Sequence, residues 1–160
     1  MGDRFQAIVD VEATAGEADA LADRMLSWFL ETGVLLSYEE VYRNESTLDG
    51  LEVATTRTVF YSLDDEPSLS CPRCGWGTTA QRWPAVDEAI SRWYEGGPDS
   101  LVCQGCGRGA GLNDWRWSPP WGFGYLGFTF WNWPEALSPA FLAEVSARLG
   151  HRTVHPYGKL

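Results

Sequence analysis

The four cysteines of the chain form two closely spaced pairs, and this spacing is typical of a metal site. Cys71 and Cys74 enclose Pro-Arg, and Cys103 and Cys106 enclose Gln-Gly. Each pair places two thiolates around one ion, and four thiolates complete the tetrahedron that zinc prefers. A glycine follows each second cysteine and permits the positive φ that turns backbone N–H groups towards the sulfurs. We therefore predict one zinc ion with these four cysteines as its ligands.

The predicted metal is structural, because four thiolates leave no coordination position open for water or a substrate. Disulfide bonds are the competing use of four cysteines, but two C-x-x-C pairs without a secretion signal favour reduced thiols. Over residues 70–108 the pairs resemble the knuckles of zinc ribbons. That resemblance implies a structural site that contacts nucleic acid or protein. A helix predicted between the pairs departs from a simple ribbon.

Iron is the alternative metal. Two such knuckles among aromatic residues are also similar to rubredoxins, and thiolate ligands alone do not separate zinc from iron. Rubredoxins are small and almost free of helix, whereas this site lies within a longer chain with predicted helices on both sides. The sequence therefore favours zinc.

The two histidines, His151 and His155, are the other residues with metal-binding or acid–base chemistry. Their spacing places them on one face of a helix or a strand. The glutamate of an H-E-x-x-H motif is absent from the chain, and histidines at such positions are commonly surface residues. An enzyme that uses these histidines and nearby acidic residues is therefore an alternative hypothesis.

No other catalytic signature is present in the sequence. The chain has no G-x-S-x-G, phosphate-loop or dinucleotide-binding motif, and no nucleophile with a recognisable base. Paired carboxylates at Glu39-Glu40 and Asp64-Asp65-Glu66 are interpreted as solvated loops. We therefore predict no catalytic residues.

Residues 115–133 contain nine aromatic side chains, with glycines interleaved among them. Such a run packs a core, forms a protein-binding surface, or offers a stacking platform for bases or sugars. Core packing is favoured, because stacking on nucleic acid needs a basic track that the chain lacks. The nine are Trp115, Trp117, Trp121, Phe123, Tyr125, Phe128, Phe130, Trp131 and Trp133.

The formal charge of −10 is concentrated in the first part of the chain. Residues 1–69 hold 15 acidic residues and 4 arginines, whereas residues 70–117 hold 5 of each sign. Such a field repels phosphate backbones and favours cations or basic proteins. A solvated acidic surface that aids solubility is the simpler interpretation.

The hydrophobic pattern predicts the elements that position these residues. A strand over 5–11, a helix over 15–31 and strands near 34–42 and 51–61 give a βαββ pattern. Thr14 and Glu17 form a capping box at the start of the first helix. Farther along, we predict a helix over 84–94, a strand at 101–102, a strand over 123–130 and a helix over 138–149. A final edge strand over 153–157 completes the pattern.

Together these elements predict an α+β protein with an antiparallel or mixed sheet and helices on one face, for which a ferredoxin-like arrangement is one form. We expect a single domain over residues 1–160, interrupted by an inserted zinc-binding lobe over residues 70–117. No run of about 20 apolar residues is present, and an acidic residue lies near the N-terminus where a signal peptide is basic. The sequence therefore predicts a cytoplasmic protein without a membrane segment.

These features favour a non-enzymatic, zinc-stabilised protein-interaction module. An inhibitor or immunity-type protein that binds a partner with a basic surface is one such module. An enzyme with a site at His151 and His155 is one alternative. A nucleic-acid-binding zinc-ribbon protein is another, and it requires the arginines of the lobe to gather on one face.

Overall fold

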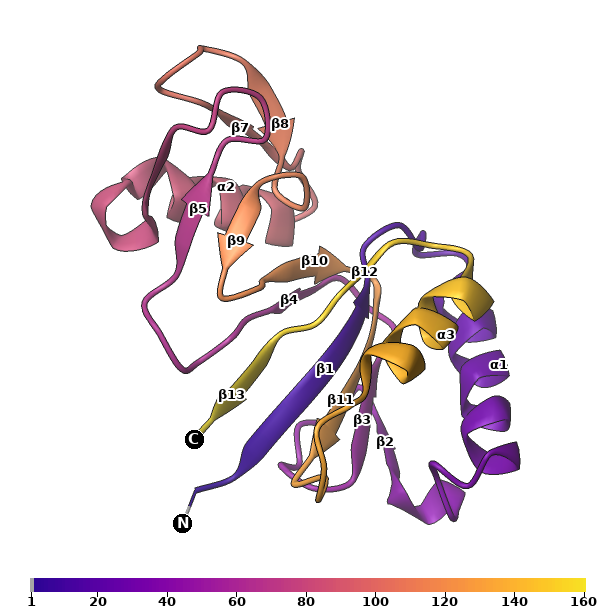
Figure 1. Cartoon of the computed structure of the whole chain (residues 1–160). Helices are drawn as coiled ribbons and strands as arrows, with labels where there is room; N and C mark the ends of the chain where they lie inside the picture. Colours follow the sequence, from indigo (N-terminus) through magenta and orange to yellow (C-terminus); the bar gives the residue numbers. More distant parts are fainter. Residues whose placement is uncertain (1) are drawn as a thin grey trace.

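The structure is a computed structural model that describes residues 2–160, which form a large mixed sheet and a smaller lobe (Figure 1). The strands of the large sheet follow the order β12 (Thr153–Val154), β1 (Arg4–Asp10), β11 (Leu126–Trp131), β3 (Leu51–Ala54) and β2 (Val41–Arg43). Strand β13 (Tyr157–Lys159) also pairs with β1. The neighbours are antiparallel except β2 and β3, which are parallel.

Two helical connections interlock in this sheet. The connection from β1 to the edge strand β2 contains α1 (Ala18–Glu31), and β11 and β3 lie between those strands. The connection from β11 to β12 contains α3 (Pro139–Leu149), and β1 lies between them. The predicted α+β class with a mixed sheet is confirmed. The ferredoxin-like arrangement stays a prediction, because the parallel edge strand β2 and the inserted lobe depart from its simple form.

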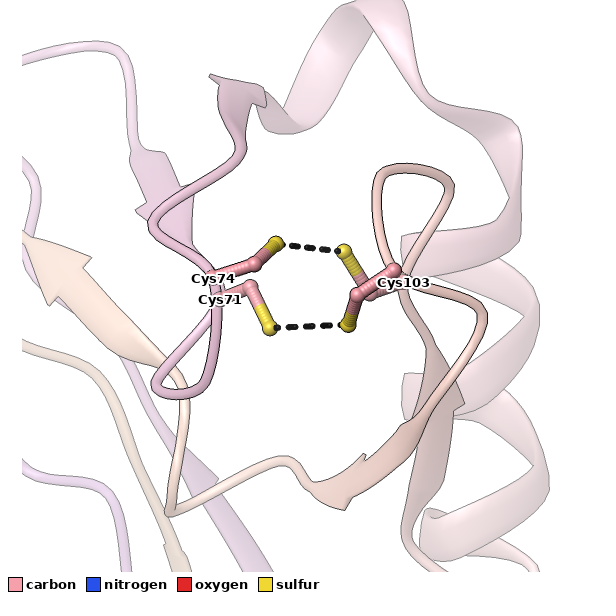
Figure 2. Close-up of side chains that lie close together, drawn as sticks. Cys71, Cys74 and Cys103 are labelled. Atoms are coloured by element: carbon pink, nitrogen blue, oxygen red, sulfur yellow. Dashed lines mark hydrogen bonds between the residues drawn. The ribbon is translucent and has the colours of Figure 1, made fainter.

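The lobe lies at the end of a two-stranded ribbon that consists of β4 (Thr58–Phe60) and β10 (Gly122–Gly124) (Figure 1). Its first cysteine loop, or knuckle, lies between β5 (Ser68–Ser70) and β6 (Gly77–Thr79), and its second lies between β7 (Ser100–Val102) and β8 (Gly109–Gly111). The two knuckles face each other, as Figure 2 shows. The lobe contains β5 (Ser68–Ser70), β6 (Gly77–Thr79), η2 (Ala80–Arg82), α2 (Pro84–Tyr94), β7 (Ser100–Val102), β8 (Gly109–Gly111) and β9 (Arg116–Ser118).

Two predicted strands are each divided in two at the base of the ribbon. The segment predicted as one strand over 51–61 leaves the large sheet after β3, where Asn44 and Thr55 exchange hydrogen bonds of 2.9 and 3.1 Å. The segment predicted over 123–130 breaks at Tyr125, between β10 and β11. Because the two breaks occur at matching positions, the same two chain segments pair first in the large sheet, as β3 and β11, and then in the ribbon, as β4 and β10. Local pattern does not reveal them, because both halves have strand-forming residues.

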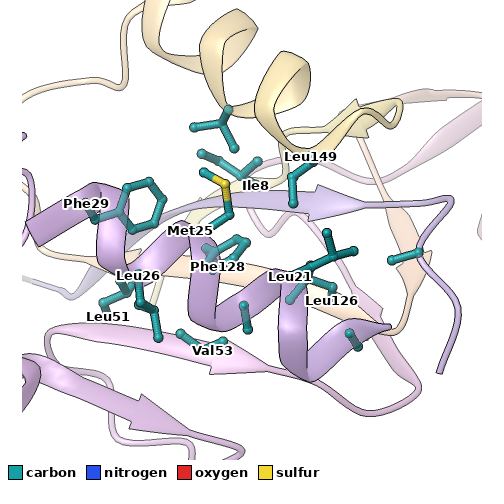
Figure 3. Close-up of a cluster of buried hydrophobic side chains, with 14 of the residues drawn as sticks. Ile8, Leu21, Met25, Leu26, Phe29, Leu51, Val53, Leu126, Phe128 and Leu149 are labelled. Atoms are coloured by element: carbon teal, nitrogen blue, oxygen red, sulfur yellow. The ribbon is translucent and has the colours of Figure 1, made fainter. Parts of the chain in front are cut away.

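The core of the large sheet lies under α1 and α3 (Figure 3). Alternate residues of β11 point towards the helices, which buries Phe128 and Phe130 completely. Phe29 of α1 is equally buried and lies edge-on to both rings, with centroids 5.5 and 5.8 Å away. This aromatic contact fixes the height of α1 above the sheet.

The sequence signals locate the ends of α3, whereas only part of the signal at the start of α1 forms. Ser138 Oγ accepts a hydrogen bond from the N–H of Phe141 at 3.1 Å, and Gly150 ends α3 with a φ of 72°. Only half of the predicted capping box forms at α1, because Glu17 accepts the N–H of Thr14 while the Thr14 hydroxyl caps nothing. The helix accordingly begins at Ala18 rather than at residue 15. No helix among residues 2–160 is long and apolar enough to cross a membrane.

Truncating Phe29 tests this core. We expect Phe29→Ala to lower the free energy of unfolding by about 3–5 kcal/mol, because the vacated volume is enclosed by aromatic rings that cannot collapse into it. Chemical denaturation followed by circular dichroism measures the change. The matched control is Leu36→Ala, since Leu36 is 81% exposed and its truncation leaves no cavity. Equal losses in the two variants would contradict the assignment of Phe29 to the core.

Candidate metal centre

The first knuckle is a tight turn held by backbone hydrogen bonds. The N–H of Cys71 donates to the carbonyl of Trp76 at 2.7 Å, and the N–H of Gly75 donates back to the carbonyl of Cys71 at 3.0 Å. Gly75 has a φ of 79°, in the left-handed region that other residues enter only with strain. The predicted role of this glycine is therefore confirmed.

The second knuckle repeats the geometry of the first. The N–H of Cys103 donates to the carbonyl of Arg108, and the N–H of Gly107 donates to the carbonyl of Cys103, both at 2.9 Å. Gly107 has a φ of 73°. The two knuckles therefore have the same backbone shape, which allows each to supply two thiolates to one tetrahedrally coordinated metal ion.

The four sulfur atoms lie within 4.8 Å of one another. Figure 2 shows them in two facing pairs, with Cys71 Sγ 3.9 Å from Cys106 Sγ and Cys74 Sγ 3.6 Å from Cys103 Sγ. A tetrahedron of thiolates around zinc has sulfur–sulfur edges of about 3.8 Å, whereas a disulfide requires about 2.05 Å. All four cysteines are free. The predicted residues therefore form a cluster within metal-binding distance.

Backbone N–H groups surround the sulfurs. The N–H of Arg73 points at Cys71 Sγ at 3.4 Å, and the N–H of Gly105 points at Cys103 Sγ at 3.2 Å. These donors stabilise negative charge on sulfur. The importance of Gly105 was not apparent from the sequence: a Cβ there would lie 2.7 Å from the Cβ of Trp76, so a larger residue would push the knuckles apart.

The thiols do not share negative charge equally. Burial raises the pKa of Cys71, but backbone N–H groups of Cys74 and Arg73 lower it by more, to about 6. The N–H of Trp76 lowers the pKa of Cys74, whereas burial and the neighbouring thiols raise it to about 11. Negative charge on one sulfur therefore makes ionisation of the neighbouring thiol less favourable. A cation is needed before all four sulfurs carry charge together, and thiolate donors suit zinc or iron.

Aromatic rings support the cluster from the lobe core. Trp76 lies edge-on to Trp83 at 4.9 Å, and Trp83 contacts Trp115 at 5.5 Å. Cys71 and Cys103 are buried beside these rings, whereas Cys74 and Cys106 are exposed. The centre therefore has one apolar side and one side open to water.

The aromatic run over residues 115–133 contributes to two cores, and none of its nine side chains is exposed. Trp115 and Phe123 are buried in the lobe, whereas Phe128 and Phe130 are buried beneath the helices. The prediction of core packing is confirmed for these residues. The first part of the run lies in the lobe core and the later part in the core of the large sheet, because the chain passes from β9 through β10 to β11.

His151 lies far from the cysteine cluster in the fold, at the C-terminal end of α3, and contacts two carboxylates. Its Nδ1 is 2.7 Å from Asp10 Oδ2, and its Nε2 is 3.7 Å from Glu17 Oε1. Asp10 is fully buried, and its other oxygen accepts the N–H groups of Glu12 and Ala13. A catalytic histidine keeps its second nitrogen free for a reacting group. Here both nitrogens face acids, which is the geometry of a structural ion pair.

His155 has different neighbours and a different electrostatic environment. Burial lowers its pKa, and its Nδ1 is buried without a hydrogen-bond partner among residues 2–160. It lines a groove of about 690 Å³ together with Gln6 and Asp64. The common face suggested by the spacing of the two histidines does not become a common site. Asp10 was not predicted as the partner of His151. The one feature of the sequence that points to it is a carboxylate within the otherwise apolar first strand.

Comparisons with known proteins found no matching family model, no matching curated protein and no matching solved structure. The function of the chain must therefore be inferred from its own residues.

The His151 ion pair predicts a pH-dependent stability. The hydrogen bond to Asp10 raises the pKa of His151 above its ordinary 6.5, and the charges of Glu17 and Glu12 raise it further. A raised pKa in the folded state stabilises the protein fully below pH 6.5, and this contribution is lost as the pH rises through the folded pKa. We expect His151→Gln to cost about 1–3 kcal/mol near pH 6, because it weakens a charge-assisted hydrogen bond to a buried carboxylate.

Denaturation of both proteins between about pH 6 and pH 9 measures this difference. Glutamine keeps an N–H donor but does not titrate, so the gap between the two stability curves should narrow at high pH. A gap of constant size across this range would show that the histidine contributes no charge to the pair.

Proposed function

We propose that this chain is a non-enzymatic protein-binding module that docks a basic, partly apolar segment of another protein. The observation that carries the proposal is a groove of about 530 Å³ on the face of the large sheet opposite α1 and α3. Strand alternation explains its position. Leu51 and Phe128 point under the helices, whereas Phe5, Thr129 and Trp131 point into the groove.

Exposed apolar side chains gather at this groove. Nine large hydrophobic residues are exposed among residues 2–160, and five of them line it. A soluble surface ordinarily scatters such residues singly, and their concentration marks interaction sites. The five are Leu48, Tyr61, Leu63, Tyr94 and Leu160.

The charge of the groove indicates the chemistry of its partner. Glu45 and Glu52 line it, and no lysine or arginine does so among residues 2–160. Phe5, Phe60 and Trp131, which are largely buried, also lie among its lining residues. Aromatic faces and carboxylates both attract cations, and arginine and lysine combine a cation with an apolar stem. The acidic residues elsewhere in residues 1–69 extend the same field.

We further propose that the cysteine cluster binds one structural zinc, and that this ion orders the inserted lobe. Cys71, Cys74, Cys103 and Cys106 would hold it, and bound zinc would contribute folding energy rather than reactivity. Zinc binding would then fix α2, whose last residue, Tyr94, lines the groove. The ion would support partner binding from a distance. Reduced thiols favour a cytoplasmic location, and an inhibitor or immunity-type role suits a module of this kind.

Replacing one cysteine tests the metal part of the proposal. Elemental analysis should find about one zinc per wild-type chain and far less in Cys74→Ser, since serine is a poor zinc ligand. Hydrogen exchange should show the greatest loss of protection in residues 68–118, because that segment relies on the metal while the helices of the large sheet have their own core.

Ser91→Ala is the matched control, since Ser91 is an exposed residue of the same lobe remote from the sulfurs in sequence. Iron in the purified protein would refute the zinc assignment. Equal loss of protection in the lobe and in α1 would refute the inserted, separately ordered lobe.

Selection from a library of random displayed 12-residue peptides tests the groove. We expect the selected peptides to combine large apolar residues with arginine or lysine. Their association should slow as salt rises, because charges separated by more than about 8–10 Å are screened near 0.15 M. Glu45→Lys combined with Tyr94→Ala should weaken binding by about tenfold or more, since both an attractive charge and an apolar contact are lost.

The control is Glu39→Lys combined with Leu36→Ala, which makes matching changes at exposed residues outside the groove. The selected peptides should associate slightly more slowly with this control variant than with the wild-type protein, and they should dissociate from both at the same rate. Selection of acidic peptides, or equal binding by the two double variants, would contradict the proposed docking site.

A further inference from the structure

A second groove, of about 550 Å³, lies on the outer face of the β6–β5–β9 sheet in the lobe. Strand alternation determines its lining. Leu69 is 2% exposed and packs into the lobe core, so its neighbours Ser68 and Ser70 point outward. The register then places Arg116 beside Ser70 and Ser118 beside Ser68.

The charge of this groove is opposite to that of the chain as a whole. Arg82 from η2 and Arg116 from β9 line it, and no acidic residue does so among residues 2–160. Within that part of the chain neither arginine side chain forms an ion pair or a hydrogen bond. By contrast, Arg43, Arg148 and Arg152 each pair with a carboxylate. Two guanidinium groups without a carboxylate partner therefore share one groove that no acidic residue lines among residues 2–160.

Hydroxyl groups accompany the arginines. Ser68, Ser70, Thr78, Thr79 and Ser118 line the groove. Ser68 Oγ donates to the carbonyl of Ser118 at 3.3 Å, and Thr79 Oγ1 is buried without a partner among the described residues. The hydroxyls of Ser70 and Ser118 make no hydrogen bond to residues 2–160, and both adjoin an arginine or another hydroxyl across the strands. Ser70 and Ser118 are therefore the hydroxyls of the groove that remain free to donate to a ligand beside the two arginines.

We propose that this face binds a small ligand that bears phosphate. Guanidinium groups bind phosphate oxygens through paired, charge-assisted hydrogen bonds, and hydroxyls complete the shell of donors around a tetrahedral anion. A long nucleic acid is disfavoured, because its many phosphates would meet the acidic surface of residues 1–69. A ligand with one or two phosphates meets only the local arginines. This site is separate from the acidic groove and goes beyond the protein-binding function.

The lobe arginines also bear on the nucleic-acid alternative. A ribbon that binds nucleic acid needs its arginines on one face. Arg82 and Arg116 share the groove, whereas Arg92 donates instead to the carbonyl of Ser100 beside α2. Two arginines match a small anion better than a backbone that carries a phosphate at every nucleotide.

Titration with pyrophosphate, with inorganic phosphate as a second arm, tests the proposal. Binding is followed by calorimetry at low ionic strength and by the NMR shifts of the backbone amides of Ser70 and Ser118, which line the groove. We expect saturable binding that weakens by about tenfold or more in the double variant Arg82→Gln/Arg116→Gln, because both guanidinium groups are lost. The double variant Arg73→Gln/Arg108→Gln removes the same charge from the same lobe outside the groove, and its affinity should stay within about twofold of wild type.

Arg116→Lys keeps the charge but loses the paired hydrogen bonds, so an intermediate affinity is expected even if the double variant folds poorly. A two-dimensional NMR spectrum establishes that each variant is folded. Equal weakening in the two double variants would reduce the effect to general charge and overturn the site. Binding that does not saturate at pyrophosphate concentrations up to about 10 mM would be weaker than a specific site requires and would also overturn the proposal. Binding of a single-stranded oligonucleotide without binding of either phosphate probe would replace the proposal with nucleic-acid recognition.

Discussion

The lobe depends on the meeting of four sulfur atoms from two knuckles. These atoms lie within 4.8 Å of one another, although 28 residues separate Cys74 from Cys103 in the sequence. Thiolates this close together repel one another, so the four sulfurs do not all carry negative charge without a cation between them. A divalent cation held by the four sulfurs would remove this repulsion, and its binding energy would help to order the chain between the knuckles. The lobe core alone is small and built around a few tryptophans.

Arg57 connects this lobe to the large sheet. Its guanidinium donates to Tyr125 Oη at 2.5 Å and to the carbonyl of Gly97 at 2.7 Å, and it lies 4.5 Å from the ring centroid of Trp93. Tyr125 marks the break between β10 and β11, whereas Trp93 and Gly97 belong to the end of α2 and the loop beyond it. One cation thus satisfies carbonyl groups at the C-terminal end of a helix and fixes that helix against the sheet. This contact therefore also positions Tyr94, the last residue of α2, in the groove lined by Glu45 and Glu52.

The sequence predicted features whose causes are local. The cysteine spacing, the glycines of the knuckles and the start of α2 at Pro84 depend on neighbours in the chain, and the structure has them as expected. The strand breaks near Thr55 and Tyr125 depend on pairing between distant segments, which no local pattern encodes. The Asp10–His151 contact joins residues 141 positions apart. The only sign of this contact in the sequence is an acidic residue in an apolar strand. Such a residue has several explanations until the fold is known.

The distribution of charge gives the two grooves different chemistry within one acidic chain. Glutamates and aromatic rings line the groove on the large sheet, whereas unpaired arginines and hydroxyls line the groove on the lobe. A uniform acidic surface would need neither arrangement, since solubility requires only that charges be dispersed. The charges of residues 70–117 sum to zero but are unevenly placed: none of the acids lines the groove on the β6–β5–β9 sheet, whereas Arg82 and Arg116 line it without a carboxylate partner among residues 2–160. This separation of charge between the sheet and the lobe would allow one small protein to bind ligands of opposite sign at the two proposed sites.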